Sequence, residues 1–139
     1  MTRPTALLRV ALLAALALAS VSIWRVREGP ASPIDAAFET QQSGLTVVAE
    51  GQVQRILADD LDGSAHQRFI MRLPSGLTLL VAHNIDLAPR IPDLQVGDLV
   101  RVRGQYEWNE KGGLVHWTHR DPKGYRDGGW VEYQGRTYQ

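Results

Sequence analysis

The sequence predicts an all-β domain in which five strands close into a barrel. Two observations lead to this class. From Leu45 onward, five segments rich in β-branched and aromatic residues are each bounded by Gly, Pro, Asp or Asn clusters. The third and fourth segments are separated by about a dozen residues that include Pro89 and Pro92, too broken for a long helix. This order, three strands, a connection and two more strands, is that of a five-stranded Greek-key barrel, and the predicted fold is OB-fold-like.

Residues 1–30 are predicted to be a hydrophobic signal or anchor helix. Arg3 and Arg9 precede an uncharged, mostly apolar run at 10–24, and Ala-Leu-Ala at 17–19 offers a small-x-small cleavage site. As a helix this run spans only about 22 Å, shorter than the roughly 30 Å hydrocarbon core of a bilayer. We therefore expect a periplasmic or secreted protein with a cleaved signal. The alternative is an uncleaved anchor that contacts the inner membrane, with the domain facing the periplasm.

The composition excludes several function classes. The chain has no cysteine, which removes disulfides, thiol nucleophiles and thiolate metal sites. Without residues 1–30 it has 11 basic and 14 acidic residues, a net charge of −3. General nucleic-acid binding is therefore not expected, because it depends on a basic surface that neutralises phosphates.

The remaining elements follow in order. A linker and a short helix, the latter at 34–42, are predicted within residues 31–44, and the barrel domain within 45–139. Within the fourth strand, Val100 and Val102 alternate with Arg101 and Arg103, so the valines are expected inside the barrel and the arginines on a solvated outer face. The predicted strands are 45–57, 67–76, 77–86, 98–108 and 113–119, followed by a C-terminal hairpin that turns at 134–135.

The alternation also predicts which side chains are internal. Period-two patterning places every second residue of a half-buried strand on the core face. The predicted interior is Val53, Phe69, Met71, Leu79, Val81, Val100, Val102 and Val115.

Polar residues with binding chemistry gather where the predicted strands end. We expect the loop after strand one, the end of strand three and the loop before strand five to flank one binding face. The candidate ligand-binding residues are Asp59, Asp60, His66, His83, Asn84, Asp86, Trp117, Arg120 and Asp121, and the candidate metal ligands are His66, His83, His116 and His119. No catalytic residue is assigned.

Each of these residues also has a structural interpretation. The Asp residues at 59–62 are typical of a polar turn, and Asn84 with Asp86 is typical of a cap. A straight strand would place His116 and His119 on opposite faces, so the pair could converge on one ion only if the strand bulged or ended near Thr118.

Four segments resemble a family of short exported bacterial proteins known only as a domain of unknown function. They are DDLDGSAHQRF at 59–69, HNIDLAPR at 83–90, VGD at 96–98 and GGLVHWTHRDP at 112–122. The resemblance covers roughly residues 51–139. It implies an exported small β domain and carries no activity.

Two main function classes are compatible with these residues. The first is an envelope binding module in which aromatic, His, Asn and Asp side chains bind a sugar, a peptide or a partner protein. The second is a metal-dependent hydrolase, such as a phosphodiesterase or nuclease of thermonuclease-like architecture, because His and Asp ligate divalent metals when no thiolate is present. A purely structural role in envelope assembly is the third alternative. No cofactor is certain, and a divalent metal is the one that the residues suggest.

Overall fold

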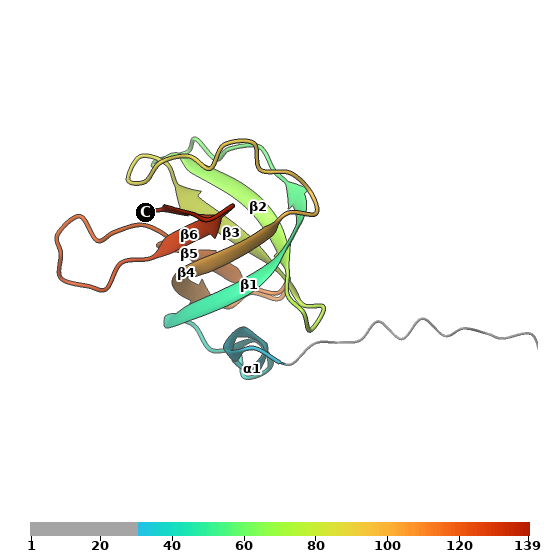
Figure 1. The fold of residues 1–139 in the computed structure, drawn as a ribbon. Helices are drawn as coiled ribbons and strands as arrows, with labels where there is room; N and C mark the ends of the chain where they lie inside the picture. Colours follow the sequence, from blue (N-terminus) through green and yellow to red (C-terminus); the bar gives the residue numbers. More distant parts are fainter. Residues whose placement is uncertain (1–30) are drawn as a thin grey trace, which may run out of the picture.

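The computed structural model describes residues 31–139, so the predicted signal or anchor helix lies outside the described residues. Seven strands in this part of the chain form one sheet, in the order β1, β2, β3, β5, β4, β6, β7 (Figure 1). A further pairing between β1 and β4 closes the first five into a barrel, which confirms the predicted class. The elements are α1 (Pro33–Glu39), β1 (Leu45–Ile56), β2 (His66–Arg72), β3 (Thr78–Asn84), β4 (Leu99–Glu107), β5 (Leu114–His116), β6 (Trp130–Tyr133) and β7 (Arg136–Tyr138).

The long strand β1 closes the barrel by pairing with two neighbouring strands. Its residues 45–52 pair with β4, and its residues 52–56 pair with β2 across a bulge between Val53 and Arg55. Gly51 lies at the changeover, where a Cβ atom would overlap the backbone carbonyl of Arg72. Glycine is therefore required for the strands to approach closely enough to close the barrel.

Strand direction decides which loops are neighbours. β1 and β3 are both antiparallel to β2, and β3 is parallel to β5, so these three strands run the same way. Their carboxyl ends lie at one end of the barrel, which we call the loop end. The hairpin at 109–113 follows β4, which is antiparallel to β1, so it lies at the opposite end. The loop before strand five, which we expected beside the other two segments, is therefore at the other end of the barrel.

The barrel interior follows the predicted alternation. The eight side chains predicted to be internal are each at most 2% exposed. Inward positions nearest the loop end are polar, with Gln67 on β2 and His83 on β3 also buried. Buried polar groups require hydrogen-bond partners, so these two side chains must be paired inside the chain.

The helix α1 closes the opposite end of the barrel. Ser32 and Asp35 form a capping box, and Pro33 occupies the first turn, where its missing N–H costs nothing. Ile34 and Ala37 are buried in the barrel core. The helix ends at Glu39 rather than at the predicted 42, since Gln41 has a left-handed backbone with φ 54°.

The C-terminal hairpin forms as predicted and lengthens the sheet beside β4. Gln134 and Gly135 both have positive φ, the geometry of a two-residue type I′ turn. β6 pairs with β4 along Arg101–Arg103.

The fifth strand is shorter than predicted, because the chain leaves the sheet after His116. Trp117 has φ 58°, a left-handed conformation that ends the extended run. Residues 117–129, which we call the 117–129 loop, then project from the barrel before the chain returns as β6 (Figure 1).

Candidate functional site

The loop end brings together the three segments that the sequence singled out. The turn after β1 folds back so that Asp60 forms a bridge with His66, and the amide of Ala65 donates to Asp86 Oδ2 at 2.9 Å. His83 at the end of β3 contacts Thr118 just beyond β5. The predicted neighbourhood of these segments therefore exists.

The acidic and amide side chains there are used by the backbone of their own loops. Asp60 accepts from the Asp62 amide at 3.0 Å. Asn84 Oδ1 accepts from the amides of Asp86 and Leu87 at 2.9 and 3.2 Å. These contacts match the turn and cap interpretations of the sequence.

Asp121 has the same kind of role in the 117–129 loop. Its carboxylate accepts from the amides of Lys123, Tyr125 and Arg126 at distances of 2.9–3.0 Å. These backbone donors, first the Lys123 amide, hold the pKa of Asp121 below its ordinary value. The neighbouring Arg120 side chain is exposed to solvent.

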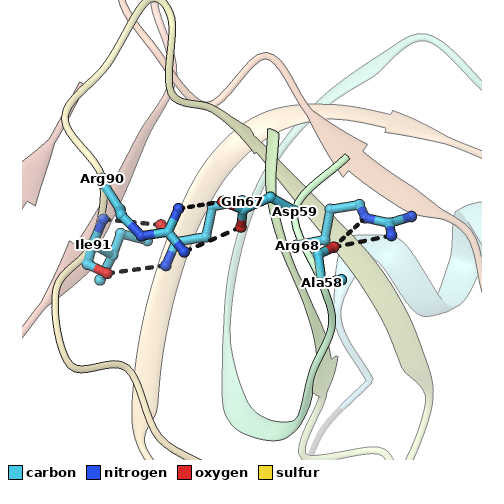
Figure 2. A network of polar contacts seen from close by, with 6 residues as sticks. All are labelled: Ala58, Asp59, Gln67, Arg68, Arg90 and Ile91. Carbon is cyan, nitrogen blue, oxygen red and sulfur yellow. Dashed lines mark hydrogen bonds and ion pairs between the residues drawn. The ribbon is translucent and has the colours of Figure 1, made fainter. Parts of the chain in front are cut away.

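A network of polar contacts fixes the segment between β3 and β4 across the loop end (Figure 2). The buried Gln67 side chain donates to the Ile91 carbonyl and accepts from the Ile91 amide, both at 2.9 Å. Beside it, Arg90 forms a two-point ion pair with Asp59, and this hydrogen bonding lowers the pKa of Asp59.

Gln67 was not identified from the sequence as a buried polar residue, although the strand alternation indicates it. Gln67 has the same strand parity as Phe69 and Met71, which were predicted to be internal. A glutamine at an inward position requires a partner, and its partner is a backbone segment more than twenty residues away.

His83, which is buried, joins the segment after β3 to the segment just beyond β5. Its Nδ1 lies 2.7 Å from Thr118 Oγ1, and its Nε2 lies 2.9 Å from the Pro89 carbonyl. Because a carbonyl only accepts, Nε2 carries the proton in the neutral ring, and Nδ1 accepts from the threonine hydroxyl. Burial lowers the pKa of His83, and the nearby His119 and His66 lower it further.

The other three histidines have separate environments. His66 Nδ1 contacts the Ser64 carbonyl at 2.8 Å. His119 Nδ1 contacts the Arg120 carbonyl at 2.7 Å, and its ring packs 4.8 Å from that of Trp117. His116 is partly exposed, 3.4 Å from Glu107. Within residues 31–139, no group of three or more His, Cys, Asp or Glu side chains is arranged to hold a metal ion.

A cleft of about 550 Å³ lies elsewhere, on the outer side of β1 and β4 against the 117–129 loop. The outward side chains of these strands form its floor, and the end of the loop forms its wall. The lining residues are Gly44, Thr46, Arg103, Gly104, Gln105, Trp117, Arg126, Asp127, Gly128 and Gly129. Of the sequence-predicted binding residues, Trp117 alone lines it.

The polar groups of this cleft differ from those of the loop end. Trp117 Nε1 is buried and has no hydrogen-bond partner, the one such side-chain nitrogen or oxygen in residues 31–139. The Arg126 guanidinium lies 5.4 Å from the centre of the Trp117 ring. Arg103 donates to the Gly128 carbonyl, and its Nη2 lies 3.7 Å from an Asp127 carboxylate oxygen.

Gly129 holds the base of the 117–129 loop against the barrel. A Cβ atom at this position would overlap the carbonyl oxygens of Trp117 and Arg103. Its amide donates to the His119 carbonyl at 2.7 Å. The close backbone contact therefore requires glycine and fixes the wall of the cleft.

The fold and the site define a small OB-fold-like barrel with an outer cleft and a polar loop end. By comparison with protein families, the chain belongs to the family described as Protein of unknown function (DUF3465), which matches residues 15–139. No curated protein matches the chain. Among residues 31–139, no helix is long and apolar enough to cross a membrane.

Proposed function

We propose that this protein is an exported binding module of the bacterial envelope, and that its ligand occupies the cleft between β4 and the 117–129 loop. The observation that carries the proposal is that Trp117, which lines this cleft, has a buried indole N–H without a hydrogen-bond partner. A buried donor without a partner is rare in folded proteins, because leaving it unpaired costs about 1–3 kcal/mol. A ligand whose acceptor reaches this N–H, after a small movement of the ring, removes the penalty.

The charge and shape of the cleft support binding. Two guanidinium groups, those of Arg103 and Arg126, line a concavity within the usual size range of small-ligand sites. Side chains at the loop end, by contrast, are engaged with the backbone of their own loops. A ligand at the cleft therefore does not have to break the contacts that hold the barrel end together.

A nuclear magnetic resonance screen tests the proposal. The purified chain is labelled with nitrogen-15 and mixed in turn with small acidic, neutral and basic fragments. We expect binding fragments to shift the indole N–H of Trp117, assigned with Trp117→Phe, together with the amides of Gly128 and Gly129. Shifts confined to the loop end, or no binding by any class, would contradict the proposal.

A matched pair of variants controls this screen. Thr46 is an exposed β1 residue that lines the cleft, whereas Thr137 is an exposed β7 residue outside it. Thr46→Trp fills the cleft without entering the core and is expected to abolish the shifts. Thr137→Trp makes the same chemical change elsewhere and is expected to leave them unchanged.

Export is part of the proposal and is supported by the sequence of residues 1–30. Fractionation of bacteria that express the full chain tests it. We expect the protein in the periplasmic or secreted fraction, or in the inner-membrane fraction if the segment stays uncleaved. A cytoplasmic chain with its first thirty residues intact would contradict export.

A further inference from the structure

The charged side chains that line the cleft carry more positive than negative charge. Arg103 and Arg126 supply the positive charge, and Asp127 is the single acidic side chain among the lining residues. The Arg103 side chain is 24% exposed, whereas that of Asp127 is 94% exposed. Arg103 is therefore largely buried in the floor of the cleft, whereas Asp127 on the loop is almost fully exposed to solvent.

The pairing between them is loose. Arg103 Nη1 is engaged with the Gly128 carbonyl, but Nη2 is 3.7 Å from Asp127, beyond hydrogen-bond distance. A guanidinium has five N–H donors in a fixed fork that suits a two-point contact with a carboxylate or a phosphate. Asp127 makes no such contact, so donors of Arg103 remain available.

We infer that the cleft takes a compact anionic group, a carboxylate or a phosphate, and that this group binds by replacing the Asp127 carboxylate beside Arg103. The inference rests on the proposed binding function and names the chemical class of its ligand. Displacing Asp127 costs little, because an exposed ion pair contributes little and its carboxylate returns to water. The incoming anion makes the charge-assisted contacts that Asp127 lacks.

Asp127 thereby lowers the affinity of the cleft for anions. Its charge competes at Arg103 until a ligand with better geometry takes its place. Neutral fragments do not have this competitor, so their binding is independent of Asp127. This difference separates a ligand-displaced side chain from an ordinary surface ion pair.

Titration of the purified full-length chain tests the inference, with inorganic phosphate and propionate as separate probes at low ionic strength. The readout is the Trp117 indole resonance. We expect Asp127→Asn to bind the anions roughly two- to five-fold more tightly, the range that an exposed pair allows. Whichever probe binds identifies phosphate or carboxylate as the preferred form, and added sodium chloride is expected to weaken both.

The matched control is Glu132→Gln. Glu132 pairs with Arg101, the neighbouring outward arginine of β4, at 3.3 Å and does not line this cleft. The Glu132→Gln substitution removes one negative charge from the same sheet. Equally tighter anion binding in both variants would therefore indicate a general charge effect and overturn the inference. No tightening in Asp127→Asn would also overturn it.

Loss-of-function variants complete the test. Arg103→Ala is expected to weaken anion binding at least several-fold. Arg126→Ala, at an exposed position, is expected to have the same effect and serves as a second test if the loop shifts in Arg103→Ala. Retained affinity in both variants would overturn the inference. Binding of neutral fragments in the cleft without any binding of phosphate or propionate would refute the anionic class while leaving the proposed function intact.

Discussion

The loop end and the cleft both contain polar and charged residues, but they differ in how those residues are paired. At the loop end, Asp60, Asn84 and His83 each contact the backbone or a neighbouring hydroxyl of this chain. Among the residues that line the cleft, Trp117 has an unpaired N–H and Arg103 is only loosely paired with Asp127. The comparison teaches that residue type identifies chemistry, whereas unsatisfied pairing identifies a candidate site.

The largest expected effect concerns the loop end. Gln67→Leu leaves the buried amide and carbonyl of Ile91 without their side-chain partner. We expect the free energy of unfolding to fall by about 2–4 kcal/mol, since each unpaired buried group costs about 1–3 kcal/mol. Urea denaturation measures this, and Gln52→Leu at an exposed position of β1 is the control, with an expected change within about 0.5 kcal/mol. Equal stability of the two variants would show that the loop end is not held by this contact.

The next effect is the pH dependence contributed by His83. Burial lowers its pKa in the folded state, so between the ordinary value of 6.5 and the lowered value the unfolded chain binds more protons. Stability is therefore full above about pH 6.5 and falls as the pH drops, by at most about 1.4 kcal/mol per pH unit for one proton. Denaturation at pH 7.5, 6.5 and 5.5 measures the slope. His83→Gln is expected to flatten it, and an unchanged slope in that variant would assign the dependence to other groups.

A smaller effect is expected at the exposed pair of Arg90 and Asp59. Arg90→Gln removes a two-point ion pair at the surface and is expected to lower stability by about 0.2–1 kcal/mol. It is also expected to raise the pKa of Asp59 toward its ordinary value. A double-mutant cycle with Asp59→Asn measures the coupling. A coupling well above 1 kcal/mol would contradict the expectation that this is an ordinary surface ion pair.

The smallest expected effect is that of divalent metals, which bears on the hydrolase alternative. Both ring nitrogens of His83 are engaged, and residues 31–139 hold no three-ligand group. We therefore expect no saturable heat when zinc, copper, manganese or calcium is titrated into the protein at pH 7.5. A one-site heat that disappears in His116→Ala/His119→Ala would contradict this expectation and support the predicted metal site and the hydrolase alternative.

The sequence by itself determined the barrel, its interior and the C-terminal turn. These follow from local rules, because strand alternation puts Val81 and Val102 on the core face and Gln134-Gly135 fits a type I′ turn. It also placed the polar clusters of β1 and β3 near one another, since strands that run the same way end together.

Only the tertiary structure decided which polar residues are already engaged. Gln67 pairs with the carbonyl and amide of Ile91, and His83 pairs with a hydroxyl and a carbonyl, all on other segments. No periodicity of β2 or β3 specifies these partners. The cleft likewise depends on Trp117 leaving the strand and on Gly129 fitting against two carbonyls. Burial and pairing arise from distant contacts, so the same histidine, aspartate or arginine becomes a structural group or a binding group only when the chain has folded.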